Sequence, residues 1–146
     1  MGRIKHYIGK WNSLSGQGKL IFLKAAVCLV LIKLGLKFLP FITFRKAYHW
    51  LCNTNSFQEI SQEKINQTVW AVDTAANLLP LNLLCLPRAL ATKYLLRKVP
   101  ALTLEIGVEV NPGKRFEAHA WVEKNGSVIM GNWPESVLYQ QIWVWK

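Results

Sequence analysis

Acidic residues are missing from the first third of this sequence. The first 50 residues contain no Asp or Glu, whereas they carry nine of the 18 Lys and Arg residues. The rest of the chain balances nine basic groups against eight acidic ones, so the net charge of +10 belongs to the N-terminal third. Such a segment suits an acidic polypeptide, an anionic membrane surface or nucleic acid. A basic face that is merely solvated is the alternative.

Side chains that could hold a metal ion are also scarce. The chain has three Cys and three His, and the pair His49 and Cys52 lacks a second pair of ligands. No metal or cofactor is therefore predicted. Cys28 lies in the apolar stretch AAVCLV, where a buried and unreactive thiol is expected.

No apolar run is long enough to span a membrane comfortably. Lys24, Lys33 and Lys37 interrupt the run from Leu20 to Phe44, and its longest uncharged core covers residues 25–32. A helix packed on its own domain or on a protein partner is the favoured interpretation, with an interfacial helix or a membrane span as alternatives. No small-residue cleavage site follows this apolar core, so it does not resemble a signal peptide. We therefore expect a cytoplasmic protein with reduced thiols. Peripheral association with a membrane is compatible with this location.

The middle of the sequence predicts two helices. SFQE at residues 56–59 matches a capping box, and apolar residues then recur at helical spacing as far as Pro80. The segment CLPRALATKYLLRK follows, with Pro87 suited to a first helical turn. Cys85 is therefore expected at the N-terminus of the second helix.

After residue 100 the apolar period changes from 3.6 to 2. Residues 102–110 and 116–123 alternate like half-buried strands, Asn125-Gly126 is a strong hairpin signal, and YQQIWVW at 139–145 predicts a further strand. Helices followed by an antiparallel sheet indicate an α+β fold. We expect a basic helical segment over residues 1–55 and a catalytic domain over residues 56–146.

Cys85 and His119 are the best candidates for a nucleophile and its base. The unpaired N–H groups and positive end of a helix favour a thiolate at Cys85. His119 lies on a strand between two alanines that leave room for an incoming chain. A thiol at a helix start and an imidazole on a following sheet is the usual layout of cysteine nucleophile and general base.

Asn132 is the candidate for the residue that orients His119. A two-residue turn at Asn125-Gly126 pairs Lys124 with Ser127, and the same register places Asn132 opposite His119. The pattern predicts a Cys–His–Asn triad. A plain turn residue after the strand is the alternative for Asn132. The side chain of Asn82 is a candidate donor to the oxyanion, beside the backbone N–H of Cys85.

Three motifs, CLPRALATKYLLRK, LEIGVEV and AHAWVEKNG, resemble the transglutaminase-like cysteine peptidases of lasso-peptide biosynthesis. The resemblance covers about residues 60–135. It implies a transglutaminase- or papain-like core in which Cys85 is the nucleophile, His119 is the base, and the third residue, often Asp in relatives, falls at Asn132. It further implies a bacterial enzyme that removes the leader from a ribosomally made precursor peptide.

The same resemblance implies the partners of such an enzyme. They are the precursor peptide, a separate leader-recognition protein and an ATP-using lasso cyclase, and no nucleic acid is expected. Two other functions remain open: an amide-forming acyltransferase on the same residues, and a non-enzymatic basic adaptor that docks a peptide or membrane.

Overall fold

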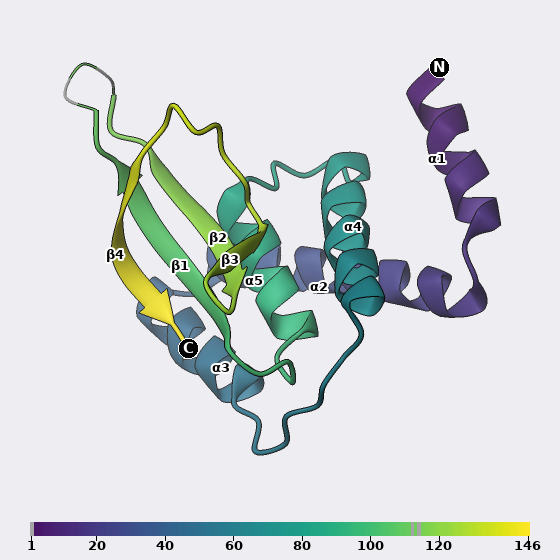
Figure 1. The fold of residues 1–146 in the computed structure, drawn as a ribbon, viewed down its shortest axis with the longest axis horizontal. Coiled ribbons are helices and arrows are strands. Elements are labelled where there is room, and N and C mark those ends of the chain that lie inside the picture. The colour runs from purple at the N-terminus through teal and green to yellow at the C-terminus, as the bar shows by residue number, and fades with distance from the viewer. Residues whose placement is uncertain (1, 112, 114) are drawn as a thin grey trace.

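The computed structural model describes residues 2–111, 113 and 115–146. Over these residues helices come first in the chain and an antiparallel sheet follows, so the predicted α+β class is confirmed (Figure 1). The helices are α1 (Gly2–Ser13), α2 (Gly16–Phe38), α3 (Phe41–Cys52), α4 (Gln62–Leu78) and α5 (Cys85–Leu95). The strands are β1 (Leu102–Glu109), β2 (Ala118–Lys124), β3 (Ser127–Met130) and β4 (Tyr139–Trp145).

Helix α4 begins later than the sequence predicts. Its N-cap is Ser61, whose hydroxyl accepts a hydrogen bond from the Lys64 N–H at 3.4 Å. The capping box predicted at residues 56–59 is wrong, because Ser56 forms a local turn with Thr54 instead. The Gln58 N–H donates to the Lys98 carbonyl at 2.8 Å, which ties this irregular segment to the chain beyond α5.

The end of α4 and the start of α5 lie where they were predicted. Helix α4 stops just before Pro80, which lacks the N–H needed to continue it. Cys85 is the first residue of α5, and the N-cap, Leu84, has no side-chain capping bond. The N–H groups of the first turn are therefore left for another acceptor.

The sheet has the strand order β3-β2-β1-β4, and all of its pairs are antiparallel. One face packs on α5 and buries Leu104, Ala120 and Val122. Asn125 and Gly126 both adopt positive φ, 51° and 78°, as a two-residue hairpin turn requires. The predicted hairpin and the predicted pairing of Lys124 with Ser127 are confirmed.

Beyond this turn the predicted register is wrong. Glu123 pairs with Val128, but the next pair is Val122 with Met130, so one extra residue, Ile129, lies on the β3 side. Such a bulge shifts every later partner by one residue. Strand β3 then ends at Met130, and the expected strand pairing of His119 with Asn132 does not form.

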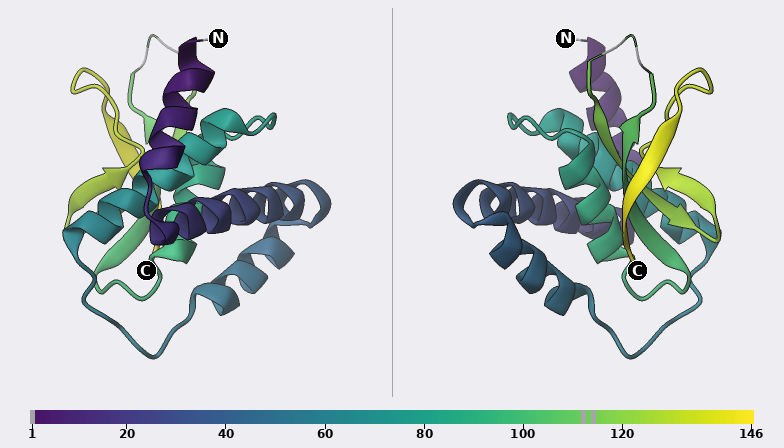
Figure 2. Two further views of the ribbon diagram at one scale, coloured as in Figure 1. Left: turned by 90° about the vertical axis from the view of Figure 1, so that its right-hand side faces the viewer. Right: turned by 90° about the vertical axis from the view of Figure 1, so that its left-hand side faces the viewer.

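Helices α2 and α3 of the basic N-terminal third pack on the rest of the chain. Ala25 and Leu29 of α2 are fully buried, and α2 contacts both α4 and α5, as the interpretation of a helix packed on its own domain requires. The Tyr48 hydroxyl of α3 donates to the Leu90 carbonyl of α5 at 2.7 Å. In Figure 2, α2 and α3 diverge from the turn that joins them. None of the helices over the described residues has the length and hydropathy of a membrane span.

We predict that α2 unfolds together with residues 56–146. This prediction tests whether the boundary expected at residue 55 separates two folding units. Leu29→Ala should lower the free energy of unfolding by about 2–5 kcal/mol, because it leaves a cavity between α2, α4 and α5. Leu31→Ala, in the same helix but on its exposed side, should change it by less than about 0.5 kcal/mol. Calorimetry should show a single transition in both variants. Two separate transitions, with only one of them shifted by Leu29→Ala, would instead support two folding units.

Candidate active site

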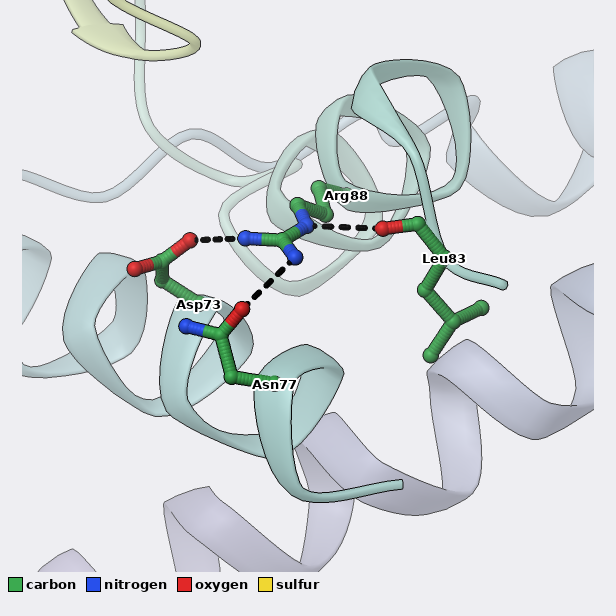
Figure 3. Close-up of polar contacts among 4 residues, drawn as sticks. All are labelled: Asp73, Asn77, Leu83 and Arg88. Atoms are coloured by element: carbon green, nitrogen blue, oxygen red, sulfur yellow. Dashed lines mark hydrogen bonds and ion pairs between the residues drawn. The ribbon is translucent and has the colours of Figure 1, made fainter. Parts of the chain in front are cut away.

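Arg88 fixes the segment that leads into Cys85 (Figure 3). Its Nε donates to the Leu83 carbonyl at 2.9 Å, its Nη2 donates to Oδ1 of Asn77 at 2.8 Å, and its Nη1 forms an ion pair with Asp73. Asp73 and Asn77 both belong to α4, so the guanidinium joins α4 to the approach of α5. The one aspartate of the sequence therefore contributes to this network and not to the orientation of His119.

A second cation holds the same segment from α2. Nζ of Lys33 donates to the Asn82 carbonyl at 2.7 Å. Asn82 is exposed and does not line the cleft described below, so the expected role of its side chain as an oxyanion donor is not supported by its position. Arg88 of α5 binds the Leu83 carbonyl and Lys33 of α2 binds the Asn82 carbonyl, so two consecutive carbonyls before the thiol are held by side chains.

His119 meets Cys85 where β3 leaves the sheet. The imidazole is close enough to the Cys85 thiol to be the largest influence on the pKa of that thiol, and Nε2 of His119 lies 2.6 Å from the Gly131 carbonyl oxygen. Because a carbonyl only accepts, Nε2 carries a proton and donates it there. The other ring nitrogen, Nδ1, is then left to exchange a proton with the thiol.

Gly131 is a site residue that the sequence reasoning missed. Its φ is +86°, and a Cβ on it would lie 2.8 Å from the Ala120 carbonyl, closer than a side chain can approach. A glycine is thus required for the chain to turn away after Met130 and direct its carbonyl at His119. In the sequence, a glycine directly after an apolar strand indicates that the strand ends there. It does not indicate that the carbonyl of that glycine contacts His119.

The contacts of the thiol shift its pKa downward. The hydrogen bond to His119 lowers the pKa of Cys85 most, burial opposes it, and the N–H groups of Ala120 and Leu86 lower it further. The Ala120 N–H is available because β3 no longer pairs with this part of β2, and the Leu86 N–H belongs to the first turn of α5. A strand N–H and a helix N–H thus both lower the pKa of the same thiol.

The pKa of the imidazole is shifted in the opposite direction. The hydrogen bond to Cys85 raises the pKa of His119 most, desolvation lowers it, and the Gly131 carbonyl raises it again. A lowered thiol pKa beside a raised imidazole pKa favours the thiolate–imidazolium pair over the neutral pair. By contrast, burial raises the pKa of Cys28 to about 12 and also raises that of Cys52.

Aromatic side chains hold the imidazole ring in place. It stacks on Tyr139 with ring centroids 5.0 Å apart, lies nearly parallel to Trp121 at 6.1 Å, and meets the edge of Trp133 at 5.6 Å. Trp121 can occupy its position because residue 107 is glycine: a Cβ there would lie 2.7 Å from the indole ring. Trp133 and Tyr139 arrive from the chain after β3, and the sequence did not predict them as neighbours of His119.

Cys85 and His119 open into a cleft of about 600 Å³ between α4, the start of α5 and the β2–β3 edge. Asn132 also lines it, so all three sequence-predicted residues border one cavity. Asn132 is exposed, however, and over the described part of the chain its side chain has no hydrogen bond with His119. The wall contributed by α4 consists of Asn66, Val69, Trp70 and Asp73.

No group of three His, Cys, Asp or Glu side chains that could hold a metal ion occurs among residues 2–111, 113 and 115–146. The cleft brings together the Cys85 thiol and the His119 imidazole, and the imidazole is bound by the Gly131 carbonyl. A thiolate paired with an imidazolium at a helix start is the arrangement of cysteine-dependent acyl-transfer enzymes.

Comparison with known families agrees with this class. The sequence matches the transglutaminase-like superfamily over residues 26–144, and the chain belongs to that superfamily. Its members are generally enzymes of the cysteine-protease type, and membership indicates a peptidase or acyltransferase type of activity. The match begins within α2, and thus includes helices of the basic third. No curated protein and no solved structure matches the chain.

We predict that Cys85 is the most reactive thiol in mildly acidic solution. Its lowered pKa leaves a larger thiolate fraction at about pH 6 than a thiol of ordinary pKa would have, whereas burial keeps Cys28 and Cys52 protonated. Limited alkylation with iodoacetamide, mapped by mass spectrometry, should label Cys85 first. His119→Ala should slow that labelling at about pH 6 and much less at about pH 9, because it removes the group that lowers the thiol pKa. Faster labelling of Cys52 in the parent protein would contradict the assignment.

Proposed function

We propose that this chain is a cysteine peptidase that removes the leader from a ribosomally made lasso-peptide precursor. The observation that carries the proposal is the meeting of Cys85 and His119, with oppositely shifted pKa values, at the wall of an open cleft. The superfamily supports the cysteine-type chemistry. The choice of a precursor as substrate comes from the resemblance of the three motifs to lasso-peptide leader peptidases.

The reaction begins when the Cys85 thiolate attacks the carbonyl carbon at the junction of leader and core. A carbon–sulfur bond forms and the carbonyl oxygen becomes an oxyanion, for which the backbone N–H of Cys85 is the proposed donor. The tetrahedral intermediate then collapses, the peptide C–N bond breaks, and the His119 imidazolium gives its proton to the departing amine. The core leaves with a free α-amino group, and the leader stays on Cys85 as a thioester.

Water completes the cycle. Neutral His119 takes a proton from water as the water attacks the thioester, and the carbon–sulfur bond breaks to release the leader as a carboxylate. The Gly131 carbonyl holds Nε2 throughout, and thereby keeps Nδ1 directed at the sulfur and the leaving group. The free amine of the core is the group that an ATP-using cyclase needs to close a ring, so the proposed peptidase acts before such an enzyme.

The proposal includes a cytoplasmic location and a separate leader-recognition protein. Cys28, Cys52 and Cys85 are all free thiols, which suits a reducing compartment. The superfamily match covers residues 26–144, and the cleft beside Cys85 is open. A partner that binds the leader would raise the local concentration of the scissile bond at this cleft.

We predict that incubation with a precursor peptide yields leader and core as two fragments, and that the rate rises when a leader-binding protein is added. Mass spectrometry distinguishes the outcomes. Cys85→Ser should abolish the reaction, whereas Cys52→Ser, which changes a thiol outside the cleft in the same way, should keep it. A product in which an added amine has replaced water would identify an acyltransferase. If the precursor stays uncleaved even with the leader-binding protein present, the result would favour the non-enzymatic adaptor.

We predict a supporting role for Asn132 in stabilising the imidazolium, even though it does not pair with His119 in the sheet. Asn132→Ala should lower kcat about tenfold with little change in KM, which corresponds to one net hydrogen bond of about 1–1.5 kcal/mol in the transition state. Asn132→Asp should restore the rate and raise the pKa of His119, because a carboxylate stabilises the imidazolium. The alkaline limb of the pH–rate profile should then move to higher pH.

Asn53→Ala is the matched control, because Asn53 is also exposed and does not line the cleft. Parent-like kinetics are expected for it across the pH range. If Asn132→Ala also behaves like the parent, the Gly131 carbonyl alone orients His119 and the role of Asn132 is refuted.

A further inference from the structure

Helix α2 is apolar on the side that faces away from the protein. Its inward side buries Ala25, Leu29 and Ile32, yet the opposite side carries a continuous row of large apolar side chains, each 45–69% exposed. We call this row the apolar face of α2: Leu20, Leu23, Val27, Leu31, Leu34 and Phe38. A helix that is apolar all round is normally covered on all sides. An exposed face of this extent marks an interaction surface.

A groove lined by residues of α2 and α3 adjoins this face. The two helices diverge from the turn that joins them (Figure 2). The groove has a volume of about 800 Å³, and Val27 and Leu31 of α2 face Ala47 and Leu51 of α3 across it. Trp50, near the end of α3, is 75% exposed. Together, the groove and the apolar face of α2 form a surface that extends from α2 onto α3.

The charges around this surface have one sign. Lys24 borders the groove, Nζ of Lys37 lies 5.4 Å from the centre of the Phe38 ring, and Lys46 is exposed on α3. The first acidic residue of the chain is Glu59, which comes after α3. Two copies of the chain would bring these cations together, so self-association through this surface is disfavoured. An anionic occupant is favoured instead.

The dimensions fit a surface that lies on a bilayer. The 23 residues of α2 extend over about 34 Å, and α2 lacks the hydropathy to cross a membrane. Interfacial helices place Leu, Phe and Trp at the level of the acyl chains, with Lys and Arg among the headgroups. Lysine side chains such as those of Lys24 and Lys37 reach such headgroups while their methylene groups cover apolar surface.

We propose that the apolar face of α2 and the adjoining groove dock on an anionic phospholipid bilayer. The apolar side chains enter the boundary between headgroups and acyl chains, and the surrounding lysines bind lipid phosphates. None of the residues lining the groove also lines the catalytic cleft, so the cleft stays open to a peptide in the docked protein. The docking does not depend on the proposed peptidase activity, and its test uses no cleavage.

Co-sedimentation of the full chain with lipid vesicles tests this proposal. Vesicles that contain phosphatidylglycerol should carry the protein down, vesicles of phosphatidylcholine alone should carry less, and added salt should weaken the binding. The double variant Leu31→Glu/Phe38→Glu should reduce the bound fraction at least about tenfold, because charged groups are excluded from the acyl boundary. Both positions are exposed, so thermal midpoints close to that of the parent should show that the variant folds.

Matched controls separate this surface from general stickiness. Phe116→Glu changes an aromatic residue that is 78% exposed outside the surface, and it should bind like the parent. Lys24→Gln/Lys37→Gln should weaken binding more than Lys64→Gln/Lys98→Gln, which removes the same charge from other exposed positions. The proposal is overturned if the parent protein stays in the supernatant when anionic vesicles are present. That result is expected if the surface binds an acidic protein instead of lipid. The proposal is equally overturned if Leu31→Glu/Phe38→Glu and Phe116→Glu bind alike.

Discussion

The early end of β3 is the constraint on which the site depends. Had β3 continued to pair with β2, the Ala120 N–H and the Gly131 carbonyl would have been consumed by the ladder. Because the strand stops at Met130, the Ala120 N–H is left near the Cys85 thiol and lowers its pKa, and the Gly131 carbonyl accepts from His119. The thiol and the imidazole are thus both shifted toward their charged forms by backbone that an ordinary hairpin would have used for itself.

Backbone groups of this kind have an energetic advantage over side chains. Their positions are fixed by the fold, so no rotamer entropy is lost when they bind the thiolate or the imidazolium. Burial of Cys85 and His119 alone would have disfavoured both charges, raising the thiol pKa and lowering the imidazole pKa. The hydrogen bonds outweigh that desolvation at both residues, and the stacked Tyr139 keeps the imidazole ring in the required plane.

Much of this arrangement could be predicted from the sequence, because local rules determine it. Pro80 marks the end of α4, Asn125-Gly126 specifies the hairpin turn, and alternation after residue 100 gives the strands. The meeting of Cys85 with His119 follows from a helix start and a strand that pack against each other.

The register of β3 could not be predicted in this way. Ile129 forms a bulge that allows Met130 to be buried, and that choice depends on the packing of α4 and α5 against β3 rather than on the turn. The expected pairing of His119 with Asn132 failed because this bulge displaces the register by one residue and the strand then ends at Met130. Likewise, Ser61 rather than Ser56 caps α4, because the segment from Ser56 is tied by Gln58 to the chain after α5.

The bond from Lys33 to the Asn82 carbonyl gives α2 an influence beyond packing. The helix whose outer side is exposed also binds the chain three residues before Cys85. The next carbonyl, that of Leu83, is bound by Arg88, which is itself held by Asp73 and Asn77 of α4. The exposed helix and the segment before the thiol therefore share one network of side-chain contacts, so the position of α2 is one of the factors that set the position of that segment.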